Sequence, residues 1–248
     1  MALLTCYLDD SGTHLESAHV AVGGLVARQD DWDAFSPRWN EAIAGMGLTH
    51  WHSTDAENLR GEYGGWTRER REEAIRRLLP IVADVPGVVG AGAYVQRNMW
   101  ERYMPARGRE VFGDEYVLAN HIIFSFLGER LVAQGIDSDA WIAYILDRRK
   151  GNGAVIDLFN EAVVLPGVRE KYRLYNAASG DWMLAPLQAA DMVAYELYKE
   201  ETRWQEQRPE RRWLHNELNK LFPKRYDRAN PSFLLTLDGN PLRALYEV

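Results

Sequence analysis

The chain has 248 residues, 46% of them hydrophobic and 26% charged, and its formal net charge is −7. This composition is typical of a globular protein and excludes a disordered or collagen-like chain. The negative charge argues against a protein that coats nucleic acid nonspecifically. No apolar run reaches the roughly 18 residues that a membrane-spanning helix requires, so we expect no membrane partner.

The cellular compartment is suggested by cysteine usage. Cys6 is the single cysteine, so no disulfide can form within the chain. The first ten residues lack a basic segment and reach two acids too early for a signal peptide. A chain of this kind suits a reducing compartment, and we expect a cytoplasmic protein.

The first half of the chain predicts two strands followed by two helices. The apolar run 3–8 is typical of a buried strand, and residues 9–12 (DDSG) are typical of a turn. A second strand is predicted over 18–27, and its connection to the first is too short for a crossover helix, so the two should be antiparallel. Helices are predicted over 31–44 and, capped by Thr67, over 67–83, with an irregular segment at 46–66.

The second half alternates predicted strands and helices. Strands are predicted over 90–95, 141–146 and 172–175, and helices over 114–134, 153–165 and 186–201. This order predicts an α/β fold, with a mixed sheet of about five strands flanked by helices. We expect one domain over 1–248, in which 199–248 form a helical C-terminal extension.

Acidic residues occupy the predicted strand ends. Asp9 and Asp10 end the first strand, Asp147 follows the strand 141–146, and Asp191 lies in the second turn of the last core helix. If the first and fourth strands are neighbours, Asp9 and Asp147 meet at one sheet edge, and a helix across that edge brings in Asp191. Carboxylate oxygens suit Mg²⁺ or Mn²⁺, and two such ions about 4 Å apart can promote phosphodiester hydrolysis.

Each of these acids also has a purely structural interpretation. Asp at a strand end commonly forms the turn, because its side chain caps its own backbone. Asp191 near a helix N-terminus is favoured by the helix dipole. Spacing alone therefore leaves the metal site open.

Two segments resemble a known family. Residues 8–12 (LDDSG) and 187–191 (LQAAD) are similar to the two motifs of the family called domain of unknown function 3800, which has Asp-Glu-Ser-Gly after its first strand and Leu-Gln-x-Ala-Asp on a later helix. The resemblance extends from residue 3 to about residue 198. It implies a ribonuclease H-like fold in which Asp9, Asp147 and Asp191 match the acidic positions, with Gln188 as a supporting polar group.

The chain departs from the family pattern at two places. Asp10 stands where the family prefers Glu, next to Ser11, which we assign a supporting role. Residues 50–52 (HWH) occupy the place of a Glu-x-His segment, so His52 matches the histidine and His50 replaces the glutamate. The fourth metal ligand is thus either Asp10 or the nearby Asp55.

His52 and the residues after Asp147 have both functional and structural interpretations. His52 is a candidate for positioning a phosphate or transferring a proton, or it only hydrogen-bonds the irregular segment. The His-x-His spacing also suits zinc, but Asp55 is the only nearby acid at a suitable offset. Residues 148–150, which are Arg148, Arg149 and Lys150, either guide a backbone phosphate to the acids or form a solvated turn.

Charged and aromatic side chains elsewhere in the chain also have either a functional or a structural interpretation. The arginines of helix 67–83 alternate with glutamates, which indicates an exposed, salt-bridged face. Trp51, Trp66 and Trp182 lie in irregular segments and either stack bases or belong to the core.

Three functions compete at this point. The leading hypothesis is a metal-dependent nuclease that acts on DNA or RNA through Asp9, Asp147, Asp191 and His52. Residues 9–13 (DDSGT) also resemble the Asp-x-Asp-Gly-Thr motif of haloacid-dehalogenase-type phosphatases, but Ser11 replaces the second Asp and an antiparallel second strand conflicts with that layout. A non-catalytic acidic module would need only a broad acidic patch, whereas an enzyme needs its carboxylates to converge. The oligomeric state is undetermined.

Overall fold

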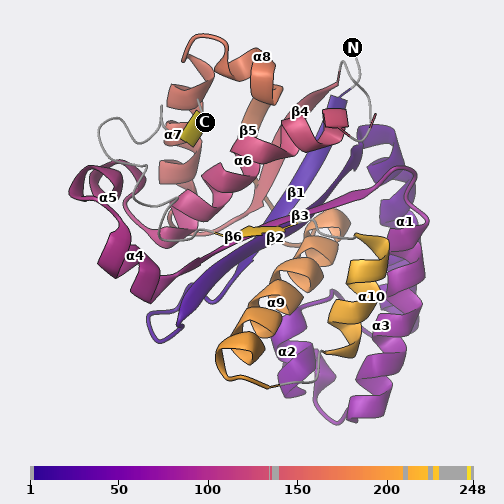
Figure 1. The fold of residues 1–248 in the computed structure, drawn as a ribbon. Helices are drawn as coiled ribbons and strands as arrows, with labels where there is room; N and C mark the ends of the chain where they lie inside the picture. The colour runs from indigo at the N-terminus through magenta and orange to yellow at the C-terminus, as the bar shows by residue number, and fades with distance from the viewer. Residues whose placement is uncertain are drawn as a thin grey trace.

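A computed structural model describes residues 3–133, 135, 140–208, 212–222, 226–228 and 245–246. The described residues form a mixed six-stranded sheet in the order β5-β4-β1-β2-β3-β6 (Figure 1). Its strands are β1 (Leu3–Ser11), β2 (His19–Arg28), β3 (Val89–Gln96), β4 (Trp141–Asp147), β5 (Leu174–Gly180) and β6 (Tyr226–Arg228). β1 is antiparallel to β2 and parallel to β4. The predicted mixed α/β sheet and the pairing of its first two strands are confirmed.

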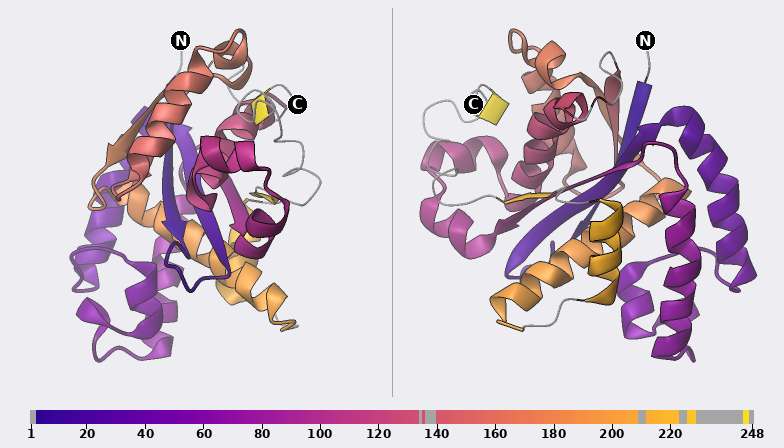
Figure 2. Two further views of the ribbon diagram at one scale, coloured as in Figure 1. Left: turned by 90° about the vertical axis from the view of Figure 1, so that its left-hand side faces the viewer. Right: turned by 45° about the vertical axis from the view of Figure 1, so that its right-hand side comes forward.

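Helices cover both faces of the sheet (Figures 1 and 2). One layer contains α4 (Arg97–Tyr103), α5 (Ala106–Phe112), α6 (Glu115–Ala133), α7 (Asn152–Val163) and α8 (Val168–Tyr172). The opposite layer contains α1 (Gln29–Gly45), α2 (Ser53–Asn58), a 3₁₀ turn (Gly61–Tyr63), α3 (Arg68–Ala83), α9 (Ala185–Gln205) and α10 (Trp213–Leu221). Each layer has its own apolar core against the sheet.

The two cores follow from the alternation of side chains along a strand. On β1, Leu8 belongs to the core under α6 and Tyr7 to the core under α9. On β4, Leu146 lies on the α6 side and Ile145 on the α9 side. The next residue of each strand, Asp9 and Asp147, therefore falls on the face that α9 covers.

Helix α9 packs directly on β1 and β2. A Cβ atom added to Gly23 on β2 would lie 2.7 Å from the Cα of Ala194, so the absence of a side chain there permits the close approach of the helix. Asp191 lies just under one helical turn before Ala194 and is brought to the end of the sheet by this contact.

Several segments differ from the prediction. Residues 9–11, predicted as part of a turn, continue β1 and pair with β2. The irregular segment 46–66 contains α2 and the 3₁₀ turn, and α4 and α5 fill residues 97–112, where no pattern predicted a helix. The strand predicted at 172–175 is found at Leu174–Gly180, because α8 continues to Tyr172.

The predicted C-terminal extension combines helix and strand. Its first residues complete α9, and α10 is a further helix, but β6 joins the sheet beside β3 instead of remaining helical. The rest of the extension, at 209–211, 223–225, 229–244 and 247–248, lies outside the described residues.

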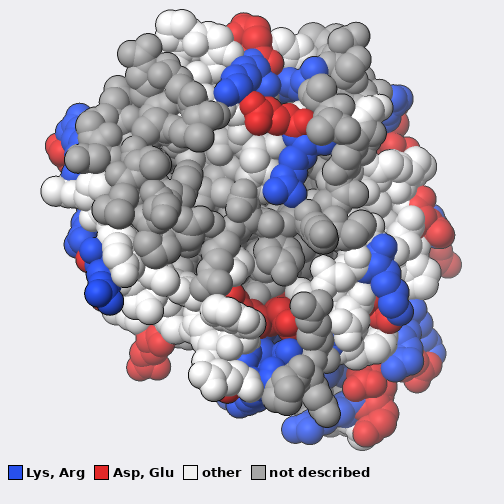
Figure 3. Space-filling model, viewed as in Figure 1, with Lys and Arg blue, Asp and Glu red and all other residues white. Residues whose placement is uncertain are grey.

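The exposed face of α3 carries both charge signs, as predicted. Arg76 and Glu72 form an i,i+4 pair at 3.5 Å, and Arg77 pairs with Glu73 in the same way. Acidic and basic side chains are interspersed at the lower right of Figure 3, where α3 lies in Figure 1. Among the described residues, no helix combines the length and apolar character needed to cross a bilayer.

Candidate functional site

A cleft of about 510 Å³ opens where β1 and β4 end and α9 begins. It brings together residues that are far apart in the sequence. Of the predicted site residues, the following line it: Asp9, Asp10, His52, Asp147, Arg149, Lys150, Gln188 and Asp191. Thr13, His50, Trp51, Thr54, Trp182 and Leu187 complete its lining.

Three of the carboxylates share one face of the sheet. In the parallel register of β1 and β4, Leu8 pairs with Leu146, so Asp9 and Asp147 come next on adjacent strands. Asp191 approaches this face from α9 and is only 8% exposed. Its Oδ2 atom accepts a hydrogen bond of 2.6 Å from the backbone N–H of Ser53, the first residue of α2.

These acids perturb one another electrostatically. Burial raises the pKa of Asp9 well above its usual value, and the negative charges of Asp191, Asp10 and Asp147 raise it further. Burial also raises the pKa of Asp147, with a contribution from Asp10. Burial raises the pKa of Asp191 to about 6, although the nearby His52 and the Ser53 N–H oppose the shift. The cleft is therefore a place where added positive charge would be stabilised.

The donor set fits a hard divalent cation. Asp9, Asp147 and Asp191 offer only carboxylate oxygens, which are the ligands preferred by Mg²⁺ and Mn²⁺. The Oδ1 atom of Asp147 is buried and has no hydrogen-bond partner among the described residues, so it is an unused acceptor. Among the residues that the structure describes, no group of three His, Cys, Asp or Glu side chains is already in a position to hold a metal ion. Binding would thus require these carboxylates to draw together.

Asp10 differs from the other acids because it has a cationic partner. It follows Asp9 on β1 and therefore points to the α6 side of the sheet. Its Oδ2 atom lies 2.7 Å from Nη1 of Arg149 and accepts a 2.9 Å hydrogen bond from Thr13. The guanidinium of Arg149 also stacks 4.1 Å from the ring centre of Tyr116. In the structure, Asp10 is engaged by Arg149, and Arg149 is correspondingly less available to a substrate.

Asp55 orients His52 instead of joining the carboxylates. Its Oδ2 atom lies 2.9 Å from Nδ1 of His52, and Asp55 itself does not line the cleft. This contact assigns the proton of a neutral His52 to Nδ1, which leaves Nε2 as the acceptor. His52 is half-exposed at the cleft wall, where a phosphate or a proton donor could reach it.

Gln188 connects several segments of the cleft wall through hydrogen bonds. Its Oε1 atom accepts hydrogen bonds from the indole N–H of Trp39 at 3.0 Å and from the backbone N–H of Trp51 at 2.8 Å. Its Nε2 atom donates to the carbonyl of Met183 at 3.1 Å. The side chain thereby joins α1, the segment before His52 and the turn before α9.

The structure does not bring every predicted residue to the cleft. Arg148 is exposed and Ser11 ends β1, and neither lines it. Trp51 lines the cleft but is only 3% exposed, and Trp66 is buried in the core, so neither is a free stacking surface. Trp182 is 49% exposed and does line the cleft.

Sequence reasoning missed Asn152, the first residue of α7. Its Nδ2 atom donates 2.8 Å hydrogen bonds to the carbonyl of Asp147 and to Oγ of Ser179. Its Oδ1 atom accepts a 2.8 Å hydrogen bond from the hydroxyl of Tyr116. The sequence signal that could have identified Asn152 is a polar residue at the start of the helix that follows Asp147.

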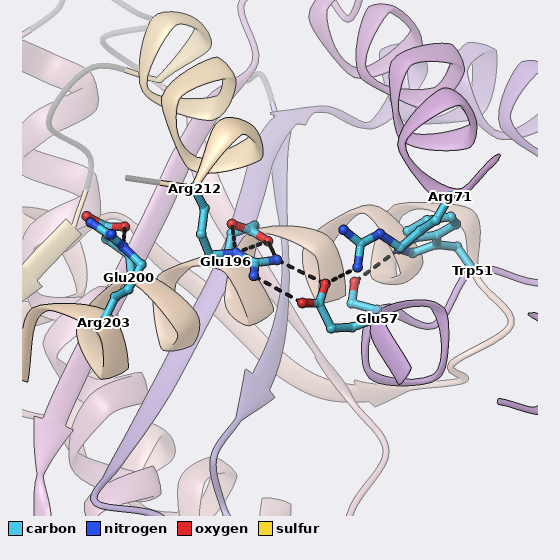
Figure 4. Close-up of polar contacts among 8 residues, drawn as sticks. Trp51, Glu57, Arg71, Glu196, Glu200, Arg203 and Arg212 are labelled. Atoms are coloured by element: carbon cyan, nitrogen blue, oxygen red, sulfur yellow. Dashed lines mark hydrogen bonds and ion pairs between the residues drawn. The ribbon is translucent and has the colours of Figure 1, made fainter. Parts of the chain in front are cut away.

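A partly buried ion-pair network holds α2 in place beside the cleft (Figure 4). Arg212 contacts Glu57 on α2 at 3.0 Å and Glu196 on α9 at 2.8 Å. Arg71 on α3 forms a second ion pair with Glu57. Because α2 begins at Ser53, this network fixes the backbone N–H that contacts Asp191.

Comparison with known proteins finds a similar solved structure but no family. No family model matches the chain, and no curated protein does. Among solved structures, the chain is similar to the crystal structure of Bst-RNase HIII in complex with Mn²⁺, at 15% sequence identity and a TM-score of 0.45. The match covers 99% of this chain and 70% of that chain. Conclusions about the chemistry of the cleft therefore depend on its geometry.

Proposed function

We propose that this protein is a metal-dependent phosphodiester hydrolase, and specifically a nuclease, in which Asp9, Asp147 and Asp191 bind Mg²⁺ or Mn²⁺. One observation carries the proposal. Carboxylates from β1, β4 and α9 line a single cleft on one sheet face, where Asp191 is buried and Asp9 and Asp147 are partly buried. Burying unpaired carboxylates is costly, so a cation is their natural partner, whereas an acidic docking patch would expose them.

The residues around the cleft are suited to different roles in such a reaction. Cations held by Asp9, Asp147 and Asp191 would supply the activation of a water and the stabilisation of the leaving oxygen of a phosphodiester. The Ser53 N–H fixes the orientation of Asp191. Lys150 lines the cleft and is suited to orient a phosphate oxygen, and His52, with Nδ1 held by Asp55, is suited to transfer a proton at Nε2.

Metal binding is tested by isothermal titration with Mn²⁺. The wild type is expected to bind the ion, and a double Asp9→Asn, Asp191→Asn variant is expected to lose that binding. Asp157→Asn, which changes an exposed acid on α7, is the matched control and should bind as the wild type does. Equal Mn²⁺ affinity in the wild type and the double variant would refute the proposal.

Activity is tested on single- and double-stranded DNA and RNA and on small phosphate monoesters, each with Mg²⁺ or Mn²⁺. Cleavage of a nucleic acid that the double variant lacks supports a nuclease. Hydrolysis of monoesters alone would favour the phosphatase alternative instead. The antiparallel pairing of β1 with β2 still conflicts with that alternative.

Two broader assignments remain our proposals. The relationship to the domain of unknown function 3800 family is supported by the motifs at 8–12 and 187–191. A cytoplasmic location is supported by the single cysteine, Cys6, which is free and buried.

A further inference from the structure

Trp182 lies directly beside the carboxylate cleft. In the parallel pairing of β4 with β5, Asp147 is opposite Gly180, and Trp182 follows two residues later. The indole ring lines the cleft and is 49% exposed. A large aromatic side chain is therefore presented to whatever occupies the cleft.

The turn that carries Trp182 is firmly held. The N–H of Leu184 donates to the carbonyl of Asp181 at 2.9 Å, and the N–H of Met183 donates to its Oδ1 at 3.0 Å. Gln188 donates to the carbonyl of Met183 at 3.1 Å. These hydrogen bonds fix the backbone of the turn between β5 and α9 on which Trp182 lies.

One contact orients the ring. The rings of Trp182 and His50 meet edge to face, with their centres 4.5 Å apart and an angle of 79° between their planes. Nδ1 of His50 in turn lies 2.9 Å from Oγ1 of Thr49. Such an edge-to-face pair restricts the motion of the indole, while about half of its surface stays in solvent. An oriented aromatic surface of this kind is suited to stacking.

Positive charge suited to a nucleic-acid backbone lies in the same cleft. Lys150 follows Asp147 closely in the chain, is exposed and lines the cleft with Trp182, whereas the neighbouring Arg149 is already paired with Asp10. Basic groups contact phosphates, whereas an aromatic ring contacts the face of a base. The face of a base is accessible only where the base is unpaired or unstacked.

We propose that Trp182 stacks an unpaired base of a single-stranded nucleic acid whose phosphate lies at the carboxylates. This inference rests on the proposed nuclease function and names its substrate class. Within a duplex, the neighbouring base pairs cover the faces that Trp182 would contact. Single strands should therefore be bound and cleaved in preference to duplexes of the same sequence.

The inference is tested with three substrates of equal length, in DNA and RNA versions where available: a single strand, its duplex, and an oligomer built only of abasic linkers. Cleavage is measured with Mn²⁺, and binding is measured by fluorescence anisotropy without it. Trp182→Ala should weaken binding of the single strand and lower its kcat/KM by roughly 5- to 150-fold, mainly through KM. Cleavage of the abasic oligomer should not change.

Two further variants serve as comparisons. Trp182→Phe should retain part of the preference, because a smaller ring still stacks. Trp204→Ala removes a 61% exposed tryptophan on α9 that does not line the cleft, and it should behave as the wild type does.

The outcomes separate the two proposals. If the wild type cleaves all three substrates equally and Trp182→Ala changes nothing, the stacking site is refuted and the hydrolase stands. An equal loss on the single strand and the abasic oligomer would also refute stacking, because it would indicate a structural role. If single strands bind in a Trp182-dependent manner but no substrate is cleaved, the stacking site stands and the proposed hydrolase is refuted.

Discussion

Substituting Asp191 by Asn should stabilise the metal-free protein at neutral pH. The carboxyl of Asp191 is buried and has its pKa raised from 3.8 to about 6. An asparagine in its place cannot ionise, and its carbonyl oxygen can still accept the hydrogen bond of the Ser53 N–H. The variant therefore removes a buried charge while it keeps the local contact.

The sign and size of the effect follow from proton linkage. Between about pH 4 and pH 6 the folded wild type binds more protons at Asp191 than the unfolded chain does, so its stability falls as the pH rises through this window. A rise of about 2 pKa units corresponds to a loss on the order of 3 kcal/mol. Relative to the wild type, Asp191→Asn should gain this amount between about pH 4 and pH 7.

Urea unfolding across this pH range, with EDTA, measures the difference. Asp157→Asn should follow the wild-type curve. Adding Mn²⁺ at about 100 times its Kd should then stabilise the wild type by about 2.7 kcal/mol and leave Asp191→Asn unchanged. A stability difference between wild type and Asp191→Asn that is constant from about pH 4 to pH 7 would refute the electrostatic reasoning.

Three further substitutions test how the cleft is held. Glu57→Gln breaks the ion pair with Arg212 and should lower the free energy of unfolding, measured with urea, by about 1–3 kcal/mol, because the pair is only partly buried. An unchanged free energy of unfolding would argue against a stabilising role for this network. Gln188→Leu leaves the indole N–H of Trp39 without its acceptor and should cost about 1–3 kcal/mol, with a weaker Mn²⁺ affinity by calorimetry. Gly23→Ala forces α9 away from β2 and should lower both the melting temperature and Mn²⁺ affinity, whereas Gly87→Ala, at a position open to solvent, should leave Mn²⁺ affinity unchanged.

Much of the fold could be predicted because its signals are local. The apolar run at 3–8 and the short connection to the next strand predicted the antiparallel β1–β2 pair. Thr67 was predicted as a helix cap, and its side chain accepts a hydrogen bond from the N–H of Arg70. By contrast, α4 and α5 carry no clear periodicity, and they are anchored by Trp100 and Phe112 in the core beneath α6. Such anchoring is a tertiary effect that a local pattern does not contain.

The candidate site was predicted only in part, because the sequence shows where acidic residues end strands but not which side chains contact them. Acids at strand ends are visible in the sequence, and their assembly required only that β1 and β4 be neighbours, as they are. The sequence does not show which charge is neutralised by which partner. The structure pairs Asp10 with Arg149 and Asp55 with His52, although both acids had been candidate ligands.

The sequence by itself determined most of the strands and the longest helices, the apolar faces of the strands and the acids that end them, because each depends on residues a few positions apart. Only the tertiary structure decided that Asp191, on α9, faces the same cleft as Asp9 and Asp147, and that Trp182 also lines this cleft. The physical reason is that electrostatic coupling and aromatic contact act through space over a few ångströms, between residues that the chain separates widely.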